Sequence, residues 1–424
     1  MSSKELKKAL LEKYNKKAQS NDDIPFVDLN GSVFGSNPTP PTKPAIKTTT
    51  NPIFNLDPKE NTSSCSLPKP QKRSSSALFF ELNQTKKDLD LQRQEIKDLK
   101  KQLDQIFLTS SHQEQKSEVD IFIPNGEANY ISLLEQCYEF GEEESQDRTK
   151  VGTIALFSTG LEFDLSDGSF PLMTCRKMYF AGVVKEWLWM FKGQTDNNIL
   201  EKQGVKIWCH NTSREFLDKT GLTDYREGDS GPIYGFQMRH FGAEYKTCDD
   251  DYTGQGVDQL VNVFNEMKSN PSSRRLLVNC FNVKDLPKMA LPPCHYAFQF
   301  VCKKRPDGKI NCSLEFKMRS SDMILGLPWN IAFYALTLKF YCHCLGYEPH
   351  RLACSLTDAH IYKNHFENLQ TLFSRKDKLY PFPKLNIVGI NTSDSFEKIL
   401  DSVSEKNFVL TDYKCHDAID FKLN

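Results

Sequence analysis

The sequence predicts an α+β protein, in which a mixed β-sheet with surrounding helices is preceded by a disordered region and a coiled-coil-like helix. Two observations lead to this fold class. The first is a change of composition near residue 118, after which aromatic and aliphatic residues become frequent. The second is that strand-like and helix-like segments follow that point without internal repeats. Strands and helices mixed in this way indicate a single large domain, residues 118–424.

The first 75 residues are too poor in apolar side chains to form a core. Residues 21–75 contain Pro-rich and Ser/Thr-rich stretches. Such a composition cannot bury enough surface to offset the chain entropy that folding removes. We therefore expect residues 1–75 to be mostly disordered, although residues 4–17 could form a short charged helix.

Residues 76–110 carry aliphatic side chains at intervals of seven. The repeat runs through Leu82, Leu89, Ile96 and Leu103. Aliphatic residues at this interval, separated by charged and amide residues, are typical of a helix with coiled-coil character. Thr85 and Gln92 interrupt the second apolar seam. A coiled coil with a partner helix and a helix that packs on the globular domain therefore both stay open.

Helices and strands are expected throughout the globular region. Apolar periodicity predicts helices over residues 130–140, 178–191 and 328–345. In the last of these, Ile331, Ala335, Leu338 and Cys342 recur at helical spacing, as in a long buried helix. The strand-like segments are residues 275–282, 296–302 and 309–318.

Charge and composition exclude several function classes. A formal net charge of −1 gives no global field for nucleic acid or a membrane surface, and no run of about 18 apolar residues could span a bilayer. The thirteen cysteines are scattered and odd in number, and the start lacks a secretory signal. We therefore expect a reduced chain in the cytoplasm, with the nucleus as the alternative. Cys342-His343-Cys344 is too tightly spaced for a usual zinc pair, so packing is favoured there over metal binding.

The most informative local feature is the segment Leu291-Pro292-Pro293-Cys294-His295. It places a thiol directly after two prolines and directly before an imidazole. A thiol is a poor nucleophile until it is ionised, and a nearby guanidinium favours the thiolate. Arg319, in Arg319-Ser320-Ser321-Asp322, is the leading candidate for that partner. Taken alone, Cys294 would more often be a buried structural thiol. The order of the other motifs decides between the two interpretations.

Eight motifs in a fixed order resemble the thymidylate synthase family over residues 127–424. They are Asp147-Arg148-Thr149, Gly231–Gln237, Arg239–Tyr245, Ser273-Arg274-Arg275, the Cys294 motif, the Arg319 motif, Asn330 and Asp358–Tyr362. The resemblance implies a thymidylate-synthase-like fold and a methyltransferase reaction, the reductive methylation of dUMP to dTMP. The implied co-substrate is 5,10-methylenetetrahydrofolate, which leaves as dihydrofolate, and no metal is implied.

The resemblance also implies which residues carry the chemistry. The catalytic set is Cys294, Glu186, Tyr234, His295, Arg319 and Asp322. In it the Cys294 thiolate adds to C6 of uracil, so that C5 becomes enolate-like and can capture a one-carbon unit. Glu186 lies in an apolar helix, where desolvation would favour the proton exchange that a general acid or base needs. The alternative is an exposed glutamate paired with Lys185.

Recognition of the phosphate is expected to involve two subunits. A dianionic phosphate needs several cations in fixed geometry, which the guanidinium fork supplies. By resemblance, Arg148, Arg319 and Ser320 come from one subunit, and Arg274 and Arg275 come from the other. That arrangement implies a homodimer with shared active sites. The two adjacent arginines could otherwise belong to a solvated face.

The base and the sugar are expected at four further side chains. Asn330 can donate to O4 of uracil and accept from N3–H, because an amide offers both groups. A relative that acts on dCMP carries a carboxylate here, so Asn330 favours dUMP. Asp322 should meet the uracil through its backbone N–H and the folate pterin through its carboxylate. His360 and Tyr362 should hold the 3′-hydroxyl of the deoxyribose.

The folate wall completes the expected site. It comprises Ile207, Trp208, Asn211, Asp322, Leu325, Gly326 and Trp329. Trp329 stands where the family usually has Phe, which preserves an aromatic surface. Arg176 and Lys177 are expected to meet the glutamate tail of the folate.

Two departures from the family keep other functions open. Met318 precedes Arg319 where the family has Gln, which removes a hydrogen-bonding amide, and the C-terminal tail is altered. One alternative is a pyrimidine hydroxymethylase, against which the retained Trp208 argues. The other is an inactive dimeric scaffold acting through the coiled coil, against which Cys294 and Asn330 argue.

Overall fold

The structure, a computed structural model, describes residues 26–27, 33–34, 126–144 and 150–422. The chain divides into two units, Met1–Ile121 and Phe122–Asn424. In the first unit, β1 (Phe26–Val27) and β2 (Val33–Phe34) form an antiparallel pair. The rest of the predicted disordered segment, and the predicted helix over residues 76–110, lie outside the described residues.

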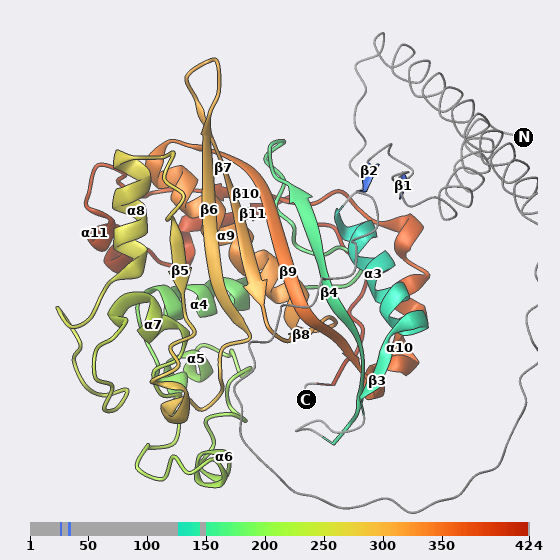
Figure 1. Ribbon diagram of the computed structural model, residues 1–424, viewed down its shortest axis with the longest axis horizontal. Helices are drawn as coiled ribbons and strands as arrows, with labels where there is room; N and C mark the ends of the chain where they lie inside the picture. The colour runs from blue at the N-terminus through green and yellow to red at the C-terminus, as the bar shows by residue number, and fades with distance from the viewer. Residues whose placement is uncertain (1–25, 28–32, 35–125, 145–149, 423–424) are drawn as a thin grey trace, which may run out of the picture. The chain divides into compact units, whose positions relative to one another are not determined.

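One mixed sheet organises the second unit (Figure 1). Its strands run in the order β3 (Glu142–Glu144), β4 (Thr153–Asp164), β9 (Glu348–Tyr362), β7 (Ile310–Met318), β6 (His295–Lys304) and β5 (Leu277–Asn279), with β8 (Ser321–Asp322) beside β9. β9 is parallel to β7 and β8 and antiparallel to β4. Because both kinds of pairing occur in one sheet, the predicted mixed sheet is confirmed.

The two faces of the sheet differ in burial. Side chains alternate between faces along a strand, so Phe316 and Leu352 are fully buried while their neighbours Lys317 and Ala353 are only half-buried. Helix α9 (Gly326–Leu345) packs on the buried face, and α4 (Phe180–Phe191) packs against α9. Both helices lie behind the sheet in Figure 1. In α9 nearly every side chain is buried, as expected for a helix that is apolar on all sides.

Shorter elements complete the unit. The remaining α-helices are α3 (Gly126–Phe140), α5 (Asn197–Lys202), α6 (Arg214–Lys219), α7 (Tyr234–His240), α8 (Gln259–Ser269), α10 (Phe366–Phe373) and α11 (Phe396–Ser402). The 3-10 turns are η2 (Leu286–Lys288), η3 (Lys363–His365), η4 (Lys376–Lys378) and η5 (Glu405–Asn407). β10 (Lys384–Ile387) and β11 (Phe408–Thr411) form a separate antiparallel pair.

The three predicted long helices are present with small shifts at their starts, as α3, α4 and α9. The predicted strands over residues 296–302 and 309–318 correspond to β6 and β7. The strand predicted over residues 275–282 is shorter, because the regular ladder with β6 covers only Leu277–Asn279. Strands β4 and β9 were not predicted, because small and polar residues interrupt their apolar alternation.

A break between β7 and β8 matters most for the site. Met318 pairs with Leu356 and Ser321 with Ala359, so both strands follow β9 in one register. Arg319 and Ser320 lie in the gap, outside the ladder. Their side chains are therefore released from the sheet at the end where β7 and β9 finish.

None of the helices in the described part of the chain is long and apolar enough to cross a membrane.

Candidate active site

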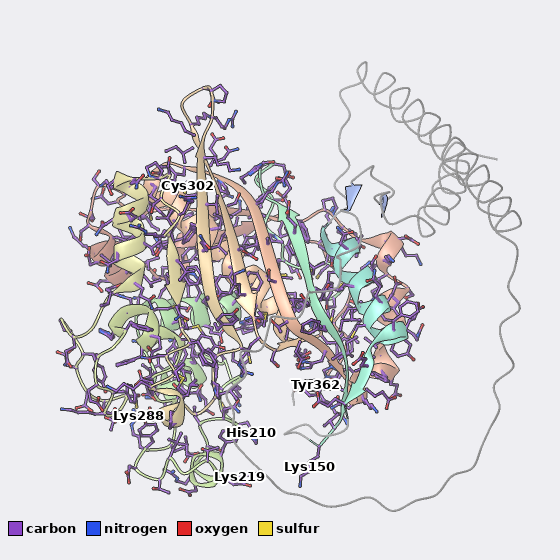
Figure 2. The ribbon with its side chains drawn as sticks, in the orientation of Figure 1. Lys150, His210, Lys219, Lys288, Cys302 and Tyr362 are labelled. Carbon is purple, nitrogen blue, oxygen red and sulfur yellow. The ribbon has the colours of Figure 1, made fainter. Side chains whose placement is uncertain are left out.

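A cavity of about 770 Å³ opens at this end of the sheet, within the size range of ordinary ligand sites. The ends of β7 and β9 and the starts of β4 and β6 contribute to its wall, through Met318, Tyr362, Thr153 and His295. Figure 2 shows Tyr362 at this end of the sheet and Cys302 of β6 near the opposite end.

Most of the predicted site residues line this one cavity. They are Glu186, Ile207, Trp208, Asn211, Tyr234, Cys294, His295, Arg319, Ser320, Asp322, Leu325, Gly326, Trp329, Asn330, His360 and Tyr362. These residues come from segments up to about 180 positions apart (Glu186 to Tyr362), so folding alone brings them together.

The half-buried Cys294 thiol faces the Arg319 guanidinium. The Arg319 Nη2 atom lies 3.9 Å from the Cys294 Sγ atom. Arg319 Nε and Nη2 also donate to the carbonyl oxygens of Pro293 and Pro292, each at 2.9 Å, and the Arg319 backbone N–H donates to Cys294 O at 3.0 Å. The two prolines therefore hold the cation beside the thiol. A fixed positive charge at this distance favours the thiolate.

These contacts also bear on Met318, which replaces the glutamine that the family has before Arg319. Met318 is buried and pairs with His295 across β6 and β7. The guanidinium of Arg319 is held by main-chain carbonyls, so its position does not depend on an amide at residue 318.

Tyr234 and His295 form a stacked pair beneath the thiol. Their ring centroids are 4.2 Å apart and the planes are 18° from parallel. The Tyr234 hydroxyl oxygen accepts the backbone N–H of Cys294 at 2.8 Å. His295 Nδ1 lies 2.8 Å from the hydroxyl oxygen of Tyr334, a residue that the sequence analysis missed. Burial lowers the pKa of His295 to about 3, so the imidazole is neutral near pH 7.

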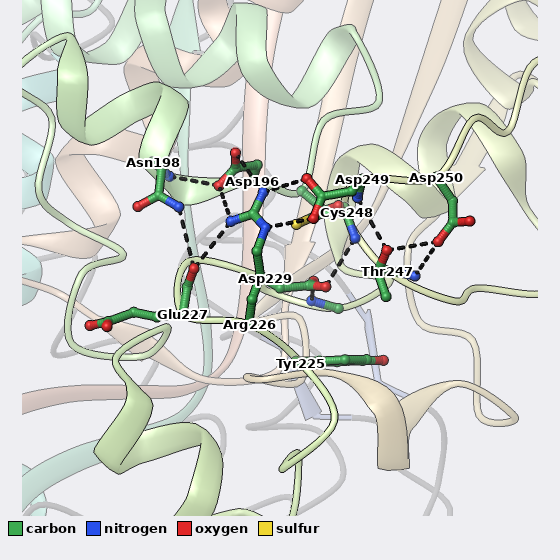
Figure 3. Close-up of polar contacts among 12 residues, drawn as sticks. Asp196, Asn198, Tyr225, Arg226, Glu227, Asp229, Thr247, Cys248, Asp249 and Asp250 are labelled. Carbon is green, nitrogen blue, oxygen red and sulfur yellow. Dashed lines mark hydrogen bonds and ion pairs between the residues drawn. The ribbon is translucent and has the colours of Figure 1, made fainter.

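A polar network fixes the loop that leads into α7 and Tyr234 (Figure 3). In it the buried Asp229 carboxylate accepts from Gly231 N at 2.8 Å and from Cys248 N at 2.9 Å. The same carboxylate also accepts from Tyr245 Oη at 2.6 Å. Gly231 has a φ of +72°, and a Cβ there would lie 2.1 Å from Lys288 O, so only glycine fits. These contacts hold the loop before Tyr234, which lines the cavity.

Arg226 adds a second tie in the same network. Its guanidinium pairs with Asp196 at 2.9 Å and with Asp249 at 2.6 Å. Ser230 follows Asp229 in the chain, and its N–H and hydroxyl both donate to Thr195 O. Ser230 O in turn accepts the N–H of Ala290, just before the Cys294 motif. The Tyr234 and Cys294 segments are thus held to a common scaffold.

Glu186 is a buried carboxylate between two indoles. Its Oε1 atom accepts from Trp208 Nε1 at 2.8 Å, and its Oε2 atom accepts from Trp329 Nε1 at 2.6 Å. Only 4% of Glu186 is exposed. Burial raises the pKa of Glu186 to about 7, and the two indole N–H groups act in the opposite direction. Lys185 points away, to the carbonyl of Gln203, so the alternative of an exposed pair with Lys185 is wrong.

The side chains expected to meet a nucleotide lie on three elements, β8, α9 and β9. Asp322 Oδ1 accepts from the backbone N–H groups of Ile324 and Leu325 at 2.9 and 3.2 Å, which fixes the carboxylate at the entrance to α9. Among the described residues, no side chain or backbone group hydrogen-bonds the Asn330 amide. His360 Nδ1 lies 3.1 Å from Asp358 Oδ1, and its ring meets Tyr362 edge-on at 5.2 Å.

Comparison with known sequences supports the resemblance to the thymidylate synthase family independently of the geometry. The thymidylate synthase family model matches residues 128–424. The thymidylate synthase of Saccharomyces cerevisiae is 44% identical over 303 residues, which is 70% of this chain and 97% of that protein. The human thymidylate synthase is 42% identical over 71% of this chain and 91% of its own length.

The chain belongs to the thymidylate synthase family. A further relative, the thymidylate synthase of Ascaris suum, is 46% identical over 64% of this chain and 90% of its own length. The family match starts after residue 127 and spans the whole cavity described above. The resemblance inferred from the ordered motifs is thereby confirmed.

Three predicted members of the thymidylate synthase site are not among the residues that line the cavity. Arg148 lies outside the described residues. Arg274 and Arg275 are exposed and precede β5, and Gln299 Nε2 donates to the carbonyl oxygen of Arg274 at 3.3 Å. Their role at the site of another subunit stays a prediction.

Several cavity residues were not in the predicted set. The additional ones are Glu144, Thr153, Met178, Tyr179, Leu291, Met318, Asp358 and Phe421. Phe421 comes from the C-terminal tail, where its ring lies 5.8 Å from the Arg176 guanidinium carbon. His365 Nε2 lies 2.7 Å from Lys422 O, which holds the tail in place. An aromatic residue near a chain end has no pattern in the sequence that could have marked it.

Metal binding finds no support in the described ranges. No group of three or more His, Cys, Asp or Glu side chains there could hold an ion. Cys342 and Cys344 are buried in α9, where their side chains pack among apolar neighbours.

Proposed function

We propose that the protein catalyses the reductive methylation of dUMP to dTMP, with 5,10-methylenetetrahydrofolate as one-carbon donor and reductant, and so supplies dTMP for DNA synthesis. The observation that carries this proposal is the Cys294 thiol 3.9 Å from the Arg319 guanidinium, in the same cavity as a carboxylate buried between two indoles. Such a cavity offers a nucleophile and a group whose proton can move near pH 7.

The chemistry begins with a bond from the Cys294 sulfur to C6 of uracil. The electron pair of the C5–C6 double bond moves towards the O4 carbonyl, so C5 can attack the methylene carbon of the folate. Loss of the C5 proton then breaks the bond from the one-carbon unit to N5 of the folate and leaves an exocyclic methylene group on C5. A hydride from the tetrahydrofolate reduces this carbon to a methyl group, and the folate leaves as dihydrofolate. The thiolate is expelled as the C5–C6 double bond re-forms. Two-stage bonding through sulfur divides one difficult step into easier ones.

Proton movements in this scheme fall to Glu186 and its neighbours. With a pKa of about 7, Glu186 can both take up and release a proton near neutral pH. His295 is neutral there because burial lowers its pKa to about 3, so it can orient a polar group without adding a charge. Tyr234 links His295 to the Cys294 segment, because its ring stacks on His295 and its hydroxyl oxygen accepts the N–H of Cys294.

Recognition of dUMP would rest on groups from both sides of the cavity. The Asn330 amide, which has no hydrogen-bond partner in the described part of the chain, offers a donor for O4 and an acceptor for N3–H. His360 and Tyr362 would meet the 3′-hydroxyl. Ser320 and Arg319 would meet the phosphate together with Arg148. The folate would lie against Trp208, Trp329 and the remaining wall residues.

A single incubation tests the proposed reaction. Purified protein is mixed with dUMP and methylenetetrahydrofolate, and the nucleotide mass and the dihydrofolate absorbance are followed. Formation of dTMP with an equal amount of dihydrofolate is the expected result. A hydroxymethylated nucleotide without dihydrofolate would instead indicate a hydroxymethylase. Absence of any product would favour the third interpretation, an inactive dimeric scaffold that acts through the coiled coil.

We also propose that the active form is a homodimer in which Arg274 and Arg275 reach the phosphate of the partner's site. Two observations support it. The arginines are exposed and outside the cavity of their own chain. The half-buried face of the sheet carries exposed apolar side chains, with Phe157 86%, Val301 46% and Leu277 43% exposed. A second copy would cover them, as the isologous contact of a two-fold dimer does.

Complementation between two inactive chains tests the sharing of sites. One chain carries Cys294→Ala, and the other carries Arg274→Ala with Arg275→Ala. In a mixed dimer one site receives an intact thiol and intact arginines, so some activity should return. As a control, mixing the Cys294→Ala chain with itself should restore none. Absence of recovery under proven subunit exchange would exclude shared sites.

The N-terminal extension and the location of the protein complete the proposal. We expect a chain of residues 118–424 to remain dimeric and to turn over dUMP at a rate close to that of the full chain. Loss of activity in a folded chain of this length would mean that the predicted helix over residues 76–110 helps to assemble the site, alone or through a coiled-coil partner. All cysteines in the described ranges are free thiols, which supports a reducing compartment, the cytoplasm or the nucleus.

A further inference from the structure

Glu186 receives its two hydrogen bonds from different parts of the fold. Trp208 follows α5 in the chain, whereas Trp329 lies in the first turn of α9. Each indole N–H meets a different carboxylate oxygen, at 2.8 Å for Trp208 and 2.6 Å for Trp329. The carboxylate therefore has both oxygens occupied by neutral donors, and its plane is fixed relative to the cavity.

Helix α4 is shaped to receive the Trp329 ring. Gly182 lies one turn before Glu186 on α4. A Cβ at that position would come within 2.7 Å of the Trp329 Cη2 atom and within 2.5 Å of the Tyr179 Cδ1 atom. A contact that short would force the ring to move. Because glycine in a helix interior costs about 0.5–1 kcal/mol relative to alanine, its presence here is explained by the space that the indole and the Tyr179 ring need.

Among the described residues, burial and the Trp208 and Trp329 indoles set the pKa of Glu186, and no cation contributes to it. The titratable groups that face it are Tyr234 of α7 and Tyr334 of α9. Lys185 on the same helix is directed to Gln203 O, and to Glu405 of η5 at 3.9 Å. The negative charge of the buried carboxylate is therefore stabilised chiefly by the two indole N–H groups.

We propose that Trp329 is a positioning residue for the reaction. Its indole N–H favours the ionised form of the Glu186 carboxylate over the protonated form and fixes the orientation of the carboxylate. This assignment rests on the proposed function, because it concerns the acid–base group of that reaction. A phenylalanine at the same position would keep an aromatic wall for a ligand but would leave Glu186 Oε2 without its donor.

The decisive measurement is the titration of Glu186 itself in the full-length protein without substrate. The carbonyl band of the protonated carboxyl is followed by infrared difference spectroscopy and assigned by its loss in Glu186→Gln. In Trp329→Phe the midpoint should move upward by about one pH unit, which corresponds to about 1.4 kcal/mol. The sign follows because loss of a donor to the charged form favours the protonated form.

Trp187→Phe is the matched control. Its indole N–H also donates within the core, to Thr337 Oγ1 at 2.9 Å, but it makes no contact with Glu186. The control should leave the Glu186 midpoint unchanged. An unchanged midpoint in Trp329→Phe, or an equal shift in Trp187→Phe, would overturn the assignment.

Activity gives the second readout. The acid limb of the pH profile of kcat/KM should shift upward in Trp329→Phe by the same amount as the infrared midpoint, and it should not shift in Trp187→Phe. An acid limb identical to that of the unsubstituted protein would overturn the assignment. Failure of the unsubstituted protein to make dTMP would instead refute the proposed function, and the infrared titration would still decide what Trp329 does to Glu186.

A second replacement guards against a folding defect in the Phe variant. Substitution of Trp329 by 3-benzothienylalanine keeps the size of the ring and removes only the N–H. It should produce the same upward shift as Trp329→Phe. Gly182→Ala should shift the midpoint in the same direction, because the added methyl group displaces the indole. No shift with the isostere would overturn the assignment.

Discussion

The two sides of the cavity stabilise negative charge in different ways. The strand side consists of Cys294, Arg319 and His360, at or beside the ends of β6, β7 and β9. The helix side consists of Glu186 on α4 and Trp329 on α9. On the strand side a guanidinium lies 3.9 Å from the half-buried thiol. On the helix side two neutral indoles bond a carboxylate that is only 4% exposed.

This difference separates a permanent charge from one that depends on pH. An arginine is protonated at every pH at which the protein folds, so it favours the thiolate throughout. Neutral N–H donors only partly offset the desolvation of Glu186, and its pKa is about 7. The same cavity therefore combines a cysteine nucleophile, Cys294, whose thiolate is favoured by the Arg319 cation, with a carboxyl group, Glu186, that exchanges its proton near neutral pH.

The largest effect is expected on the strand side, from Cys294→Ser. A hydroxyl is far harder to ionise than a thiol, so turnover should fall on the order of a thousandfold or more, while dUMP still binds. Turnover assays and equilibrium binding of dUMP check the two halves of this prediction. Cys248→Ser, at a half-buried cysteine outside the cavity, should keep full activity. Near-normal turnover by Cys294→Ser would contradict a covalent role for the thiol.

On the helix side, Glu186 should make the protein less stable as pH rises. Its folded pKa of about 7 lies above the ordinary value of 4.5. Its contribution to stability is therefore complete below pH 4.5 and is lost as pH rises through 7. Between pH 5 and 8 the free energy of unfolding should fall by about 2–3 kcal/mol more in the unsubstituted protein than in Glu186→Gln. Glu201→Gln, an exposed change on α5, is the control.

Denaturant unfolding at both pH values measures this difference. If the free energy of unfolding changed equally with pH in the unsubstituted protein and in Glu186→Gln, Glu186 would have an ordinary pKa. The helix side of the cavity would then carry no charge that changes near neutral pH.

His295 should produce the opposite slope. Burial lowers its pKa from 6.5 to about 3, so its stabilising contribution is present above pH 6.5 and is lost as pH falls towards 3. From pH 7.5 to 5 the unsubstituted protein should lose about 2 kcal/mol of unfolding free energy that His295→Gln retains. His350→Gln, at a half-buried histidine of β9, gives the comparison. An equal loss in His295→Gln would show that the imidazole is not desolvated.

The smallest effect is expected for the choice of base at Asn330→Asp. Replacing the amide donor by a carboxylate oxygen should weaken dUMP use and improve dCMP recognition, because the amino group of cytosine is a donor. A buried polar group left unpaired costs about 1–3 kcal/mol, so the ratio of kcat/KM for the two nucleotides should change by about tenfold or more. An unchanged ratio would place the discriminating contact on another residue.

Much of the candidate site was accessible from local patterns. The Pro-Pro-Cys-His segment marked the thiol, and Arg319 was named as its partner from the need for a cation. Glu186 was recognisable as a carboxylate in an apolar helix, which already indicated desolvation. Tyr334 was not recognisable, because a tyrosine on a buried helix has no pattern that separates a partner of His295 from an ordinary core residue.

The sequence by itself determined the family, the fold class and the residue types that the chemistry needs, because these depend on composition, periodicity and the order of short motifs. Only the tertiary structure decided how those residues meet. The bond from Trp329 to Glu186 joins positions 143 residues apart, and the release of Arg319 depends on a break between β7 and β8 along β9. Contacts of this kind arise from the packing of α4 against α9 and from strand register, which no local pattern encodes.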